Sequence, residues 1–111
     1  MADLQSSPEE MRAKLKELGP VLQTDRMTVE QADRGAAMIR DGIVSMGGDP
    51  SDKELLEGAM MASWFALKIT LLFPVPSLAQ NLWYQTEILR RMIDGEMPIM
   101  SISDMLGLSN A

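Results

Sequence analysis

Four Ser or Thr residues in this chain each precede a run of apolar residues at helical spacing and have Glu or Gln three places further on. This is the capping-box pattern, in which both side chains satisfy backbone N–H groups at the N-terminus of a helix. No run alternates between apolar and polar residues with a period of two, so no sheet is expected. The pattern therefore predicts four helices. Their starts lie at Ser7 to Glu10, Thr28 to Gln31, Ser51 to Glu54 and Ser77 to Gln80.

Apolar spacing gives the expected extent of the first two helices. The first carries one apolar stripe and should end or kink at Gly19 and Pro20, because Pro20 has no N–H to donate to the residue four places before it. The second carries a seam with Ala at its centre, where another helix can approach closely, and should end at Gly47. The stripe consists of Met11, Leu15, Leu18 and Leu22, and the seam of Val29, Ala32, Ala36, Ile39, Ile43 and Met46.

The third expected helix covers about residues 52–73 and is apolar nearly all round after its first turn. Such a helix belongs in the interior, so we expect it to be the central helix, with Gly58, Ala62 and Ala66 forming a stripe of small residues. The fourth helix should cover about residues 78–94, and a short fifth element residues 102–106. The expected fold class is all-α: a small bundle of four to five helices in a single domain over residues 1–111.

Charged and apolar residues divide unevenly along the chain. Residues 1–57 contain 12 acidic and 7 basic residues, whereas residues 58–111 contain 4 and 3 and are more than half apolar. The second half must therefore be buried by the domain itself, by another chain or by lipid.

Composition excludes much chemistry. The 111 residues include no Cys and no His, which removes disulfides, thiol nucleophiles, the commonest metal ligand and the side chain that titrates near neutrality. We therefore expect no enzyme, no cofactor and no metal. The net charge of −6 repels phosphate, so no nucleic-acid partner is expected.

Residues 95–111 form a candidate docking tail. Ile102, Met105 and Leu106 have the spacing of anchors on a short helix laid into a groove, on this chain or on a neighbouring one. Methionine adapts to irregular surfaces, which adds Met97 and Met100 to the candidate partner-binding residues. The large aromatic residues Trp64 and Trp83 complete that set.

The leading hypothesis is a non-enzymatic helical subunit that binds protein, either itself or a larger assembly. Its small, acidic, Cys-free composition suits structural or assembly-accessory proteins of viruses and phages. Two alternatives remain open. Residues 58–76, with Lys68 as their one charge, could insert into a membrane, and the acidic surface could inhibit a partner with a basic surface. The N-terminal sequence carries no pattern of a signal peptide, so the expected location is cytoplasmic or virion-associated.

Overall fold

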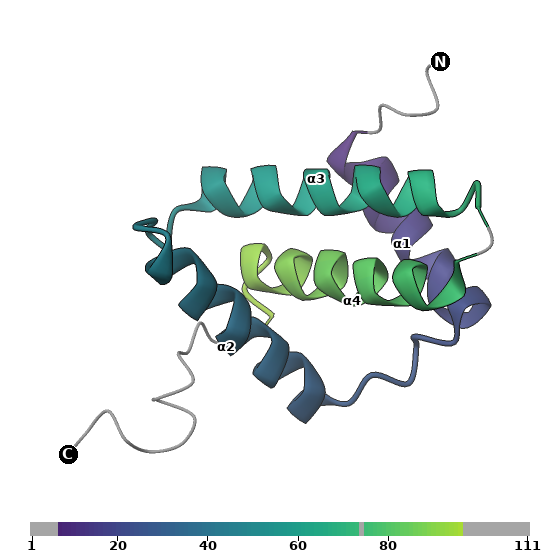
Figure 1. Cartoon of the computed structure of the whole chain (residues 1–111), viewed down its shortest axis with the longest axis horizontal. Coiled ribbons are helices and arrows are strands. Elements are labelled where there is room, and N and C mark those ends of the chain that lie inside the picture. The colour runs from purple at the N-terminus through teal and green to yellow at the C-terminus, as the bar shows by residue number, and fades with distance from the viewer. Residues whose placement is uncertain (1–6, 74, 97–111) are drawn as a thin grey trace.

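The structure, a computed structural model, describes residues 7–73 and 75–96. In this part of the chain it contains four helices and no strand, which confirms the all-α prediction (Figure 1). The helices are α1 (Pro8–Leu22), α2 (Val29–Ser45), α3 (Lys53–Thr70) and α4 (Pro76–Ile93). The expected fifth element at residues 102–106 lies outside the described residues.

Helix α4 is the element that packs against all three others. It runs antiparallel to α3 along most of its length, with α1 and α2 against its other sides (Figure 1). Helix α2 comes close because its contacting residues are small: Ala32 and Ala36 are buried, and a Cβ added at Gly35 would lie 2.4 Å from Ile88 Cδ1. The largest fully buried apolar side chains come from α1, α3 and α4: Met11, Leu15, Leu56, Met60, Trp64, Leu67 and Leu89.

The first two helix starts follow the predicted caps. The Ser7 hydroxyl accepts a hydrogen bond from the Glu10 backbone N–H at 3.2 Å. At α2 the capping box is complete: Thr28 Oγ1 accepts from the Gln31 N–H at 3.1 Å, and the Gln31 side chain accepts from the Thr28 N–H at 2.9 Å. The backbone N–H groups of Thr28 and Gln31, which have no partner within the helix, are thus bonded without any tertiary contact. Sequence alone therefore locates these helix starts.

The other two predicted caps are wrong. Asp52, not Ser51, caps α3, and its carboxylate accepts from the N–H groups of Glu54 and Leu55. Ser51 instead donates to the Asp49 carboxylate in the preceding turn. Helix α4 begins at Pro76, so Ser77 lies inside its first turn and makes no cap bond. Proline favours the first helical position because its fixed φ suits the helix and its missing N–H costs nothing there.

Two predicted helix ends also differ from the structure. Helix α1 continues through Pro20 to Leu22, because a proline in the last turn removes only one backbone hydrogen bond. It closes at Gln23, whose left-handed φ of 60° turns its N–H back to Gly19 and Pro20 carbonyls. Helix α3 ends at Thr70, three residues before the expected end at residue 73, so the candidate membrane segment 58–76 is not one helix. Within residues 7–73 and 75–96, no helix has the length and apolarity that crossing a bilayer requires.

The structure also shows which faces of α2 and α3 the core uses. The α2 seam is buried only in its middle, since Val29 and Met46 at its two ends are exposed. On α3 the stripe of small residues turns away from the core: Gly58 and Ala62 are exposed, and a Cβ added at Gly58 would meet nothing within 4 Å.

Two glycine substitutions test this arrangement. Gly58→Ala should raise the free energy of unfolding by about 0.5–1 kcal/mol, because alanine restricts the unfolded chain and meets no atom in the folded one. Gly47→Ala should lower it by about 1 kcal/mol, because Gly47 has φ 83°, which alanine disfavours. Urea denaturation followed by circular dichroism measures both. Equal effects of the two substitutions would contradict the assigned backbone conformations.

Candidate partner-binding surface

Large apolar side chains gather at the end of the bundle where α3 leads into α4. Leu72 is 73% exposed and Phe73 61% exposed, and Leu71, Val75 and Leu78 beside them are also exposed. We call these five residues, together with exposed Val21 from α1, the apolar tip. Large exposed apolar patches are typical of binding sites, so the apolar tip is a candidate for one.

A groove of about 400 Å³ between α1 and α3 continues from the tip. Its apolar lining consists of Leu18 and Val21 from α1, Trp64 from α3, and Leu71, so the groove and the tip share two residues. Lys14, Glu17 and Lys68 stand at its edges. We call this feature the apolar groove.

Trp64 is almost completely buried, yet its indole Nε1 has no hydrogen-bond partner among the described residues. The ammonium group of Lys68 lies 5.9 Å from the centre of the Trp64 ring, in the position of a cation–π contact. A buried N–H without an acceptor costs about 1–3 kcal/mol, so Trp64 contributes packing but no polar bond. Among the candidate partner-binding residues, Trp64 therefore contributes its ring to the lining of the apolar groove.

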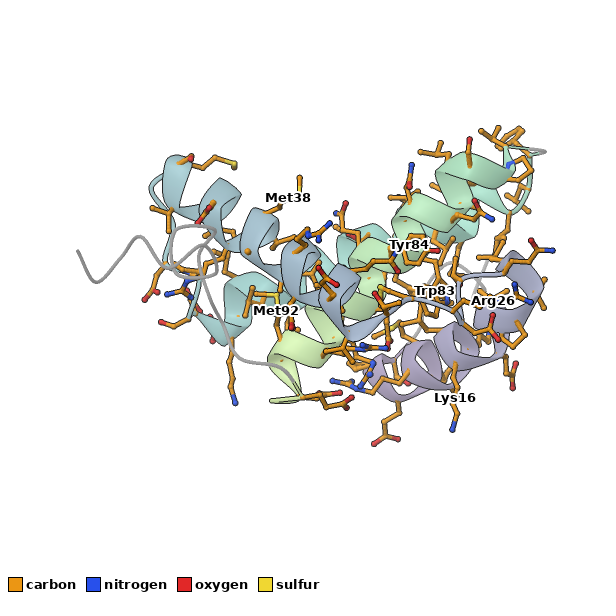
Figure 2. All side chains as sticks on the ribbon, turned by 90° about the horizontal axis from the view of Figure 1, so that it is seen from below. Lys16, Arg26, Met38, Trp83, Tyr84 and Met92 are labelled. Carbon is orange, nitrogen blue, oxygen red and sulfur yellow. The ribbon has the colours of Figure 1, made fainter. Side chains whose placement is uncertain are left out.

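Trp83 has a different environment. It is 5% exposed, and its Nε1 donates to the Leu15 carbonyl at 2.7 Å, which ties α4 to α1. Figure 2 shows Trp83 between these two helices, with Lys16 projecting outward from α1. Trp83 also lines a second hollow of about 470 Å³, the charged cleft between α1 and α4. The cleft's charged residues are Arg12, Lys16, Asp25, Glu87, Arg90 and Arg91.

Most cations of the charged cleft are already paired. Arg12 donates two hydrogen bonds to the Asp94 carboxylate, at 2.7 and 3.1 Å. Arg90 donates to Glu87, Asp94 and Glu96, and Arg91 donates to Glu87 at 2.8 Å. Arg12 therefore joins α1 to the end of α4, whereas Arg90 and Arg91 pair within α4 and the residues that follow it, and little of the arginines' charge is left for a ligand.

These ion pairs shift the titration of their members. The hydrogen bond from Arg12 holds the pKa of the Asp94 carboxyl below its ordinary value of 3.8. The bond from Arg90 does the same to the pKa of Glu96, whose ordinary value is 4.5. In return Glu87 and then Glu96 raise the pKa of Arg90. At neutral pH the shifted groups Arg12, Arg90, Asp94 and Glu96 are therefore all charged.

Sequence and structure agree only partly on the candidate surface. Met97, Met100, Ile102, Met105 and Leu106 lie outside the described residues. The tip residues Leu72, Phe73 and Val75 were not among the candidate partner-binding residues, although they lie in the segment 58–76 that the sequence offered for insertion into a membrane. The available signal was the absence of any charged residue from Ile69 to Thr86. Among residues 7–73 and 75–96, no group of three or more His, Cys, Asp or Glu could hold a metal ion.

No protein-family model, no curated protein and no solved structure matches this chain. What its surface can bind is therefore inferred from the surface itself.

A matched pair of substitutions separates the roles of the two tryptophans. Both Trp→Phe changes remove the same atoms, but only Trp83→Phe breaks a hydrogen bond, while Trp64→Phe removes an unpaired donor. We expect Trp83→Phe to lower the free energy of unfolding by about 1 kcal/mol more than Trp64→Phe does. Guanidinium denaturation followed by circular dichroism measures the difference. A larger loss of stability for Trp64→Phe than for Trp83→Phe would contradict the finding that Trp64 Nε1 has no hydrogen-bond partner among the described residues.

Acid should weaken the joint between α1 and α4. The pKa values of Asp94 and Glu96 are lower in the folded chain than in the unfolded one. Their contribution to the free energy of unfolding is therefore complete above the ordinary carboxyl pKa values of 3.8 and 4.5. It is lost as pH falls through the lower, folded-state values. Stability should thus be nearly constant above about pH 5 and fall below about pH 4.

The variant Asp94→Asn assigns this acid dependence. Its free energy of unfolding should be about 1 kcal/mol lower than that of the wild type at pH 7. It should also fall less steeply in acid, because one of the two carboxyls no longer titrates. Asp33→Asn on α2 is the control, since Asp33 makes no ion pair with the described residues, and it should keep the wild-type profile. Denaturation midpoints between about pH 3 and pH 7, a range that brackets the ordinary carboxyl pKa values, report both. Identical profiles for the two variants would exclude Asp94 as a contributor.

Proposed function

We propose that this chain is a non-enzymatic helical subunit that associates with a second copy of itself through the apolar tip. The observation that carries the proposal is the exposure of large apolar side chains at one end of the bundle, with Leu72 and Phe73 more than half exposed. Burying such side chains against protein contributes about 25 cal/mol for each Å² of apolar area removed from water. The tip thus supplies a driving force that the isolated chain does not use.

The distribution of charge favours this end of the molecule for association between copies. Each chain has a net charge of −6, so two copies repel each other over most of their surfaces. The segment from Ile69 to Thr86, which includes most of the tip, contains no charged residue. Contact there removes apolar area from water without taking any charge of this segment out of water.

The same surface suits a symmetric pair. In a two-fold dimer the same patch serves both subunits, so the patch must be complementary to itself. An apolar projection such as Phe73 beside the apolar groove meets that requirement, since each subunit offers both shapes. Association with itself is one of the two forms of the leading hypothesis from the sequence, the other being binding to a larger assembly.

The test places one carboxylate on the tip. Leu72→Glu should raise the dissociation constant of self-association at least tenfold, equivalent to about 1.4 kcal/mol, because it forces a charge into the interface. Sedimentation velocity over a range of protein concentrations measures it, and circular dichroism checks that the variant folds.

Val29→Glu is the matched control. Val29 is as exposed as Leu72, at 73%, but it lies at the start of α2, away from the tip (Figure 1). A glutamate in the first turn of a helix is favourable, so this variant should fold and associate like the wild type. A wild-type chain that stays monomeric at every concentration, or a Leu72→Glu variant that associates unchanged, would exclude the proposal.

A further inference from the structure

Helix α3 has a second apolar face, which is directed away from the core. Its residues follow a 3-4-3-4 spacing, the spacing of the a and d positions of a heptad repeat, and all of them are exposed. The large side chains among them are at least 37% exposed, and the same spacing continues to Leu72 of the apolar tip. We call the following five residues the outer face of α3: Leu55, Gly58, Ala62, Phe65 and Ile69.

No described residue covers this face. The core uses the opposite side of α3, where Leu56, Met60 and Leu67 are buried and the helix packs against α4. A Cβ added at Gly58 on the outer face would meet no atom within 4 Å. Because the outer face leads directly to Leu72, it continues the apolar tip along the whole length of the helix.

Small residues precede large ones along most of the outer face. Gly58 and Ala62 are followed by two large side chains, Phe65 and Ile69. In an antiparallel pair of copies, Gly58 of one copy lies opposite Ile69 of the other, so a large side chain fills the space above a small one. The same register places Ala62 opposite Phe65, because both pairs are centred between residues 63 and 64.

The ends of the outer face fit this register as well. Leu55 of one copy lies opposite Leu72 of the other, and this pair has the same centre between residues 63 and 64. The apolar tip thus contacts the start of α3 in the other copy. A parallel pair would place Gly58 against Gly58 and Phe65 against Phe65, which leaves a gap at one level and crowds the other.

Charge favours the same antiparallel orientation. From Gly58 to Phe73 the chain contains no acidic residue and one basic residue, Lys68, although the net charge of the whole chain is −6. In the antiparallel register Lys68 is level with residue 59 of the other copy, about 3 Å along the axis from Glu57. Glu57 and Lys68 are about three helical turns apart, so they lie on the same side of α3 and their charges attract across the interface. A parallel pair would bring Lys68 beside Lys68.

We propose that the outer face of α3 binds the same face of a second copy in antiparallel orientation, with Gly58 opposite Ile69 and Ala62 opposite Phe65. This inference rests on the proposed function for the identity of the partner, and it names the surface and the register that extend the interface beyond the tip. The two-fold axis is level with residues 63 and 64 of both α3 helices.

The absence of Cys from the sequence allows a direct test by disulfide formation between chains. One variant carries Gly58→Cys, a second carries Ile69→Cys, and the two are mixed in equal amounts under mild oxidation. A disulfide forms only when the two Cα atoms come within about 4.4–6.8 Å. In the proposed register position 58 is level with position 69 of the other chain, whereas two identical positions are about 16 Å apart along the axis.

The mixed disulfide should therefore form about ten times faster, or more, than a disulfide between two identical variants. In the control mixture Gly42→Cys replaces Gly58→Cys. Gly42 is also an exposed glycine within a helix where an added Cβ would meet nothing within 4 Å, but it lies on α2. The control should form the mixed disulfide no faster than chance collision allows. Non-reducing electrophoresis measures the rates, and peptide mass mapping identifies the joined residues.

The outcomes separate this inference from the proposed function. Faster disulfides between identical variants would mean a parallel pair, and rates equal to those of the control would mean that the outer face of α3 is not the interface. Both results overturn the inference, but the proposed function stands if the wild-type chain still associates. A wild-type chain that stays monomeric at every concentration overturns both.

A charged substitution supplies a second measurement that needs no cross-link. Ala62→Glu places a carboxylate in the middle of the outer face, about 15 Å along the axis from Leu72, and should raise the dissociation constant of self-association about tenfold or more. Ala13→Glu is the matched control, because Ala13 is also an exposed alanine within a helix, on α1. Sedimentation velocity measures both variants, and circular dichroism checks that they fold. An Ala62→Glu variant that associates like the wild type would exclude this interface.

Discussion

The packing of α4 against α1, α2 and α3 is the constraint on which the rest of the structure depends. Each contact has a different physical basis. Helix α3 contributes large apolar side chains such as Leu67, whereas α2 contributes small residues that let the two backbones approach closely. Helix α1 is joined by polar bonds as well: Trp83 donates to the Leu15 carbonyl within the contact, and Arg12 binds Asp94 at one end of it. The positions of the tip and the groove follow from this arrangement.

Sequence predicts the elements of this fold better than their packing. The cap of α2 is a local exchange of two hydrogen bonds between Thr28 and Gln31, so the sequence contains all the information needed. At Ser77 the same residue pattern fails because Pro76 already begins the helix. The side chain of Gln80, the expected partner of Ser77, instead donates to the Leu22 carbonyl at 2.8 Å. That contact joins two distant parts of the chain, and no local pattern contains it.

The same limit applies to the candidate surface. The apolar surplus of the second half is visible in the sequence, but an α3 that is apolar nearly all round does not show which of its faces meets α4. The structure buries Trp64 and Leu67 and leaves Phe65 and Leu72 exposed. Trp83 has the composition of a binding residue but is buried in the joint between α1 and α4. Residue type alone did not separate these two roles.

The uncharged character of the apolar tip has a consequence for temperature. Association that buries apolar surface near room temperature is driven mainly by the entropy of water, and this driving force weakens on cooling. With no charged residue from Ile69 to Thr86, no ion pair from that segment replaces it in the cold. An assembly held together by this tip would therefore dissociate when it is chilled and form again when it is warmed.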